Sequence, residues 1–181
     1  MTQLIDHRAE AYRHQLEAIA QKLQDLTRRV QHDELSDLMS EVRAKIHDPY
    51  MFVIVGEVKT GKSSFINALL ETTEDICAVA PHPMTDVIQE IVYGDTKTEQ
   101  SINPYLKRIT HPAEILEQIA IVDTPGTNTI VAHHQEITER FIPVSDLIVF
   151  VFEAKNPYRQ SAWDFFDFVK EEWRKKVIFV L

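Results

Sequence analysis

The stretch that decides the fold reads Gly56-Glu57-Val58-Lys59-Thr60-Gly61-Lys62-Ser63, which matches the phosphate-binding pattern G-x-x-x-x-G-K-S. It follows an apolar run at residues 50–55, which has the composition of a buried strand. It also precedes a run at residues 64–70 that has the composition of a helix. Strand, glycine loop and helix are the context that this motif requires, whereas an ordinary turn with an accidental lysine requires neither neighbour. The sequence therefore predicts a loop that binds a nucleoside triphosphate.

Each residue type in this loop has a part in holding phosphate. Backbone N–H groups of residues 56–64, with Ser64 as the last, can surround the phosphate oxygens, and glycine at positions 56 and 61 lets the backbone curl around them. Lys62 is expected to reach the β- and γ-phosphates, and the Ser63 hydroxyl to ligate Mg²⁺. The helix that follows adds the positive end of its dipole.

A second motif, Asp123-Thr124-Pro125-Gly126, follows the apolar run at residues 119–122. After a phosphate-binding loop, a D-x-x-G sequence is typical of a sensor for the γ-phosphate. The Asp123 carboxylate can hold a water bound to Mg²⁺. The Gly126 N–H can reach the γ-phosphate, because a glycine lets the backbone approach closely.

A threonine between the two motifs is the expected switch residue. Thr85, within Pro83-Met84-Thr85, can place its hydroxyl on Mg²⁺ and its backbone on the γ-phosphate, so that its loop orders when triphosphate binds. Thr72 and Thr73 compete for this role, but they lie too close to the end of the helix at residues 64–70. We therefore expect Ser63, Thr85 and Asp123 to form the metal site.

Composition narrows the class of protein. The 181 residues suffice for one α/β domain and an additional segment. The net charge of −9, from 28 acidic and 19 basic residues, argues against a nucleic-acid partner. The single cysteine, Cys77, allows no intramolecular disulfide and is typical of a reducing cytosol. The longest apolar run, residues 147–152, is too short to span a bilayer, so a cytoplasmic location is predicted.

Residues 1–48 are expected to form a helical leader before a second domain at residues 49–181. The leader has no glycine or proline up to residue 47 and carries an apolar stripe with helical spacing: Tyr12, Leu16, Ile19, Leu23, Leu26 and Val30. A second register follows at Leu35, Leu38, Val42 and Ile46. One bent helix or a helical pair would fit. The stripe could pack on its own domain, on residues 35–46, on a second copy, or on partners outside this chain.

From residue 50 onward, apolar strands alternate with helices. Strands are expected at residues 50–55, 87–93, 119–122, 147–152 and 176–181, and a helix is expected around residues 165–173. Residues 95–113, with Pro104 and Pro112, are assigned no element and are expected to be a connection. Nearly continuous apolar strands are typical of a sheet covered on both faces, which predicts an α/β fold.

The phosphate-binding loop, the helix at residues 64–70, the Pro83-Met84-Thr85 switch and the Asp123-Thr124-Pro125-Gly126 motif resemble those of dynamin-family GTPases, particularly the bacterial dynamin-like proteins. The resemblance covers roughly residues 45–181. It implies a three-layer P-loop GTPase domain with a mostly parallel sheet, and it implies Mg²⁺-dependent hydrolysis of GTP to GDP. It also implies self-association through the GTPase domain, remodelling or fusion of membranes through regions outside this chain, and peripheral membrane association. The leader would then be the neck.

Two departures from that family pattern affect the expectations. The chain ends at Leu181, before the N/T-K-x-D motif that reads guanine, so guanine preference is implied by the resemblance alone and the chain is expected to be a fragment of a longer protein. Thr127 stands where small regulatory GTPases carry a catalytic glutamine. Lys59 is therefore expected to supply positive charge near the β–γ bridge, and a lysine that points into solvent remains the alternative.

Two other functions stay open. An Era-like ribosome-assembly GTPase that binds RNA shares the same motifs, although the acidic charge and the leader disfavour it. A nucleotide-gated interaction protein would bind GTP and hydrolyse little of it.

Overall fold

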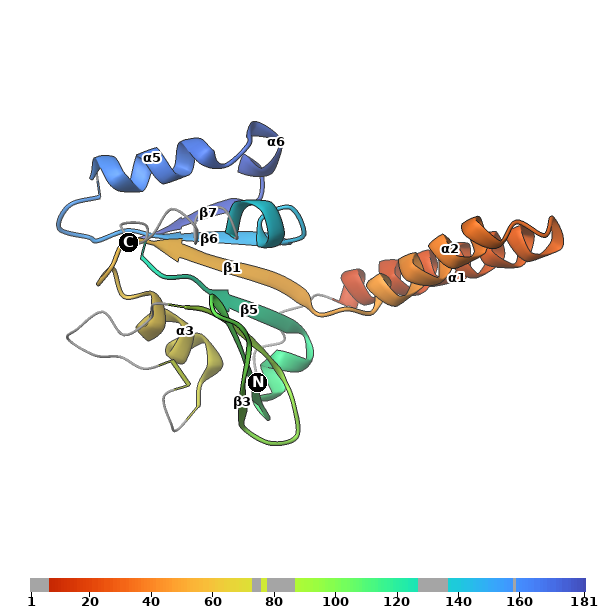
Figure 1. Ribbon diagram of the computed structural model, residues 1–181, viewed down its shortest axis with the longest axis horizontal. Helices are drawn as coiled ribbons and strands as arrows, with labels where there is room; N and C mark the ends of the chain where they lie inside the picture. The colour runs from red at the N-terminus through yellow and green to blue at the C-terminus, as the bar shows by residue number, and fades with distance from the viewer. Residues whose placement is uncertain (1–6, 73–75, 78–86, 127–136, 158) are drawn as a thin grey trace. The chain divides into compact units, whose positions relative to one another are not determined.

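The computed structural model describes residues 7–72, 76–77, 87–126, 137–157 and 159–181. Its contacts divide the chain into two compact units, Met1–Asp48 and Pro49–Leu181. Figure 1 labels elements of both units.

The second unit contains a seven-stranded sheet in the order β3-β4-β2-β5-β1-β6-β7. The strands are β1 (Tyr50–Gly56), β2 (Ile88–Tyr93), β3 (Thr98–Asn103), β4 (Leu106–His111), β5 (Ile119–Asp123), β6 (Leu147–Val151) and β7 (Val177–Val180). Four of the neighbouring pairs are parallel, while β2 with β5 and β3 with β4 are antiparallel. The expected α/β fold with a mostly parallel sheet is confirmed.

Alternate residues of the central strands point to opposite faces of this sheet, and each face has its own core. Val53 and Val55 pack with Phe150 in one core, whereas Ile54 packs with Ile66 and Leu70 of α3 (Lys62–Leu70) in the other. The first core is covered by the π-helix η2 (Ile137–Phe141), α5 (Gln160–Phe168) and α6 (Glu171–Arg174). The 3₁₀-helix η1 (Glu114–Glu117) adds Leu116 to the second. Figure 1 shows α5 and α3 on opposite sides of the sheet.

The segment at residues 95–113 is not the plain connection that we expected, because β3 and β4 form an antiparallel pair there. In β3 the sequence Thr-Glu-Gln-Ser-Ile-Asn gives exposed positions almost throughout, since this strand lies at the edge of the sheet. In β4 only Leu106 and Ile109 are buried. Such a polar edge strand lacks the apolar alternation by which a strand is detected in sequence.

The first unit is a helical pair and not one bent helix. Helix α1 (His7–Arg29) and α2 (Asp33–Ile46) run antiparallel around a turn in which Gln31 has φ 54°. The His32 side chain accepts a hydrogen bond from the Leu35 N–H and so caps the start of α2. None of the described helices combines the length and the hydropathy needed to span a bilayer.

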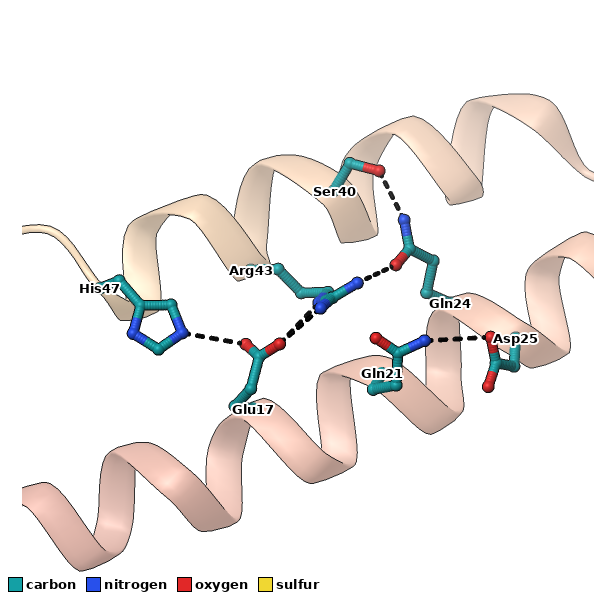
Figure 2. A network of polar contacts seen from close by, with 7 residues as sticks. All are labelled: Glu17, Gln21, Gln24, Asp25, Ser40, Arg43 and His47. Atoms are coloured by element: carbon teal, nitrogen blue, oxygen red, sulfur yellow. Dashed lines mark hydrogen bonds and ion pairs between the residues drawn. The ribbon is translucent and has the colours of Figure 1, made fainter.

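A polar network joins the two helices (Figure 2). The Arg43 guanidinium donates from Nε to Glu17 at 2.9 Å and from Nη1 to Gln24. The Gln24 amide in turn donates to Ser40 at 2.6 Å. The Glu17 carboxylate also meets His47 at 3.4 Å, and the Arg43 hydrogen bond holds the pKa of Glu17 below its usual range. Among the residues of α1, Ala20 and Gln24 are buried.

The apolar stripe of α1 does not form the contact between α1 and α2. Packing of the stripe on residues 35–46 is therefore not observed. Exposure runs from 45% at Leu23 to 64% at Tyr12 along the α1 stripe. Leu35, Leu38 and Val42 of α2 are exposed as well. The reason is that Glu17, Ala20 and Gln24, one position after stripe residues, occupy the contact instead.

Candidate nucleotide-binding site

The phosphate-binding loop connects the central strand β1 with helix α3, as the motif requires. Gly56 ends β1 with φ 153°, and a Cβ there would lie 2.3 Å from the Val151 carbonyl oxygen of β6. Only glycine allows β1 and β6 to stay paired at this point. Gly61 is the N-cap of α3, so the N-terminal end of this helix lies at the loop.

The Lys62 ammonium lies across the loop. Its Nζ donates to the Gly56 carbonyl at 3.0 Å and to the Glu57 carbonyl at 2.7 Å. Burial lowers the pKa of Lys62, and the charges of Asp123 and Glu57 act in the opposite direction. The first residue of α3 thus holds a largely desolvated cation against the backbone that the phosphates would approach.

Ser63 and Asp123 bring the two motifs together. Ser63 Oγ donates to Asp123 Oδ2 at 3.4 Å, across sixty positions of sequence. Burial raises the pKa of Asp123 to about 6, against the opposing effects of the Lys62 ammonium and the Ser63 hydroxyl. Asp123 Oδ1 is buried and accepts no hydrogen bond within the described part of the chain. A hydroxyl and a carboxylate with a spare oxygen suit Mg²⁺, which takes few protein ligands beside phosphate and water.

Gly126 lies directly against the phosphate-binding loop. A Cβ at this position would come within 2.5 Å of the Val58 backbone nitrogen, so no larger residue fits without moving the loop. Thr124 holds the Asp123-Thr124-Pro125-Gly126 motif against β1, because its hydroxyl donates to the Ile54 carbonyl at 2.8 Å. The end of β5 and the loop after β1 are therefore in contact where a γ-phosphate sensor would act.

The remaining expected site residues have different surroundings. Lys59 is exposed and has φ 66°, a left-handed conformation that is uncommon for a residue with a side chain. Thr60 Oγ1 donates to the Glu57 carbonyl at 3.0 Å, and Ser64 is exposed in the first turn of α3. Thr85, with Pro83 and Met84, lies outside the described residues, as does Thr127.

Two features of the site were missed from the sequence. The buried Glu57 carboxylate meets Arg159 at 3.4 Å, and Arg159 also pairs with Glu153 at 2.9 Å. Nothing in the spacing of these three charges indicates the contact. Asn67 of α3 donates to the Cys77 carbonyl at 2.9 Å and accepts from the N–H groups of residues 76 and 77. A polar residue inside the apolar run at residues 64–70 was the available signal.

The fold and this arrangement of loop, lysine and carboxylate define a P-loop GTPase domain. The chain belongs to the family described as 50S ribosome-binding GTPase, whose model matches residues 51–181.

Two relatives show how widely this domain is used. The chain is 39% identical over 154 residues to a probable transmembrane GTPase, FZO-like and chloroplastic, of Arabidopsis thaliana, which covers 82% of this chain and 16% of the relative. It is 27% identical over 139 residues to the tRNA modification GTPase MnmE of Mycoplasma genitalium, covering 71% of this chain and 27% of the relative. The chain thus spans a minor part of both proteins.

Two solved structures share the fold. A bacterial dynamin from an oligomerised pair superposes with a TM-score of 0.60 at 18% identity, over 87% of this chain and 30% of that one. The bacterial dynamin GTPase LeoA from ETEC superposes with a TM-score of 0.57 at 20% identity, over 96% of this chain and 29% of that one. At this identity the likeness concerns the fold alone.

Proposed function

We propose that the full-length protein binds Mg²⁺·GTP at residues 56–64 and hydrolyses it to GDP. The observation that carries the proposal is the convergence of two motifs that are distant in sequence. Ser63 contacts Asp123, and Gly126 lies against Val58, so the residues proposed for the metal and those proposed for the phosphate sensor adjoin one loop. That is the arrangement in which a GTPase recognises the γ-phosphate.

In this proposal the protein works chiefly by positioning and by electrostatics. Mg²⁺, when bound, would offset the phosphate charge, with Ser63, Thr85 and Asp123 to hold it. Lys62 would turn from the loop carbonyls toward the β- and γ-phosphate oxygens. Thr85 and Gly126 would orient the γ-phosphate through their backbones. Lys59, exposed at the edge of the loop, would supply charge to the leaving oxygen in the absence of a glutamine at position 127.

We further propose a dynamin-like role for the whole protein in membrane remodelling or fusion. The support is the resemblance of the motifs, the likeness in fold to bacterial dynamins, and the relative named as a transmembrane FZO-like GTPase. In this view the protein is cytoplasmic, contacts membrane peripherally through regions outside this chain, and self-associates through its GTPase domain.

An RNA-directed role is the second candidate, because the family description names the 50S ribosome and one relative is a tRNA modification GTPase. The net charge of −9 favours the membrane role over this one.

Single-turnover hydrolysis of GTP by the full-length protein tests these proposals. We expect hydrolysis that needs Mg²⁺ and accelerates on anionic lipid vesicles. Acceleration by ribosomes or tRNA, and none by lipid, would favour the RNA-directed role. Tight binding with negligible hydrolysis under every condition would favour a nucleotide-gated interaction protein. The same assay with ATP tests the preference for guanine.

A further inference from the structure

The phosphate-binding loop carries a buried acidic side chain where anionic phosphate is expected to bind. Glu57 follows the first glycine of the loop, and its side chain is 4% exposed. The charge of a buried carboxylate is weakly screened, so it opposes the binding of a triphosphate unless a cation balances it. A cation from outside the loop would balance this charge and leave Lys59 and Lys62 to the phosphates.

Arg159 supplies such a cation from another part of the fold. Its Nη1 lies 3.4 Å from Glu57 Oε2, and its Nη2 lies 2.9 Å from Glu153 Oε2. The Glu153 side chain is 38% exposed, so its ion pair with Arg159 is more strongly screened by water than the pair with buried Glu57. Arg159 thus connects a buried carboxylate of the loop with a carboxylate near the surface.

The fold places Arg159 beside the loop. Strands β1 and β6 are parallel neighbours with Gly56 opposite Val151, so the segments that follow both strands leave the sheet at the same edge (Figure 1). Arg159 is the N-cap residue of α5, which packs on the core through Phe166. The position of the Arg159 backbone is therefore set by α5 and not by the loop itself.

Glu57 also takes part in the hydrogen bonding within the loop. Its carbonyl accepts from the Lys62 ammonium at 2.7 Å and from the Thr60 hydroxyl at 3.0 Å. Burial lowers the pKa of Lys62 and the charges of Asp123 and Glu57 raise it, so the Glu57 carboxylate acts on the ammonium. Without Arg159, this carboxylate would compete with phosphate for Lys62.

We propose that Arg159 is a positioning residue for triphosphate binding. By pairing with the buried Glu57 carboxylate, it balances the negative charge of the loop and leaves Lys62 to the β- and γ-phosphates. This role, which rests on the proposed binding of GTP at residues 56–64, belongs to a residue outside both sequence motifs. Arg159 acts on the nucleotide through Glu57.

Three roles for Arg159 lead to different results. If the ion pair served stability alone, Arg159→Gln would lower the free energy of unfolding and leave the affinity of the folded protein unchanged. If Arg159 contacted the nucleotide directly, its removal would weaken binding whether or not Glu57 carried a charge. As a positioning residue, Arg159 should affect binding only while Glu57 is charged.

Titration of the full-length protein with a non-hydrolysable GTP analogue and Mg²⁺, in a double-mutant cycle, distinguishes the three. Arg159→Gln should raise the Kd for the analogue by about 10- to 100-fold, because it removes a cation from a buried carboxylate. In a Glu57→Gln background, the same change should alter the Kd by less than about threefold. Equal losses of affinity in the two backgrounds, or no loss in either, would overturn the proposal.

A milder variant guards against misfolding of Arg159→Gln. Arg159→Lys keeps the charge but lacks the planar fork that spans two carboxylates, so it should raise the Kd by a smaller factor. That smaller loss should also vanish in the Glu57→Gln background. Circular dichroism of each variant checks that the folded protein is being compared.

Lys155 provides a matched control on the same segment. It is exposed, and Lys155→Gln removes one positive charge between β6 and α5 while Arg159 stays in place. The Kd should remain within about threefold of the wild type, since charges in water are strongly screened. A loss as large as that of Arg159→Gln would assign the effect to the net charge of the segment and overturn the proposal.

The wild type separates failure of this proposal from failure of the proposed function. A wild-type protein that binds no GTP analogue would contradict the proposed function, and the role of Arg159 would fall with it. A wild type that binds the analogue, together with a folded Arg159→Gln that binds it as tightly, would contradict the role of Arg159 alone.

Discussion

The GTPase unit and the helical pair place their apolar residues in opposite ways. In the GTPase unit, Ile54 and Val55 point to opposite faces of the sheet, and each is fully buried. In the helical pair, the contact between the helices is mostly polar and the apolar side chains of the stripe are exposed. The GTPase unit completes its own core, whereas the helical pair is joined by the polar network around Arg43 and Glu17 and leaves its apolar face exposed.

The largest effect is expected in the GTPase unit, from Lys62→Ala. The buried ammonium already binds two loop carbonyls, and no other charged side chain of the loop does so. Loss of its charge-assisted hydrogen bonds should weaken binding of a non-hydrolysable GTP analogue by about 10²–10³-fold while the fold persists. Calorimetric titration of the full-length protein measures this, with the exposed Lys97→Ala as the control. An unchanged affinity would remove Lys62 from the site.

Lys59→Ala should act on turnover and leave affinity nearly unchanged. The side chain is exposed at the edge of the loop and lacks the carbonyl contacts that Lys62 makes, so it is available to a charge that develops during hydrolysis. We expect kcat to fall by roughly 10²–10³, below the effect of an arginine finger because lysine has no bidentate fork. Exchanging potassium for sodium should change kcat neither in the wild type nor in the variant. If the variant turns over normally, Lys59 is a surface lysine.

Asp123→Asn should stabilise the GTPase unit when metal and nucleotide are removed. Burial raises the pKa of Asp123 from 3.8 to about 6, so the folded state holds its proton more tightly than the unfolded state. Stability therefore falls as pH rises through that window, by up to about 3 kcal/mol. Asparagine carries no titrating proton, so the variant does not lose stability as pH rises.

Urea unfolding in a chelator, followed by the fluorescence of Trp163 and Trp173, reports on this unit alone. The variant should exceed the wild type at neutral pH and match it below the lower pKa. Equal stability of the two proteins at both pH values would contradict the raised pKa.

The smallest effect is expected in the helical pair, from Arg43→Ala. This change leaves Glu17 and Gln24 without their shared donor and should lower the stability of the helical pair slightly. Amide hydrogen exchange of residues 7–46 would measure the loss, with the exposed Arg28→Ala as the control. Exchange in the GTPase unit should not change. Arg43→Met keeps most of the side-chain volume and removes the charge, so it shows whether hydrogen bonding or packing stabilises the contact between α1 and α2.

How much of this could be predicted from sequence differs between the two units for a physical reason. In the GTPase unit, the loop from Gly56 to Ser63 and the strand before Asp123 carry short-range patterns that determine local structure, and the sheet followed from them. The edge strand β3 was missed because only one of its six residues, Ile102, is apolar. The contact between Glu57 and Arg159 was missed because it depends on tertiary proximity alone.

In the helical pair the helices were predicted and their contact was not. A heptad-like stripe at Leu16 and Leu23 indicates where a helix is apolar, and nothing in the spacing says which side meets its neighbour. The contact between the helices is instead determined by Arg43 of α2, which donates hydrogen bonds to two acceptors on α1, Glu17 and Gln24. Thr85 stays a prediction, as do the other residue roles at the site.

Amide hydrogen exchange of the full-length protein, with and without Mg²⁺ and a non-hydrolysable GTP analogue, tests the contrast between the two units most directly. We expect nucleotide to protect residues 56–63 and 119–126, where the two motifs adjoin, and to leave the exchange of residues 7–46 unchanged. Protection that spreads over the helical pair would contradict the independence of the two units. An absence of protection at residues 56–63 would contradict the assignment of the nucleotide site itself.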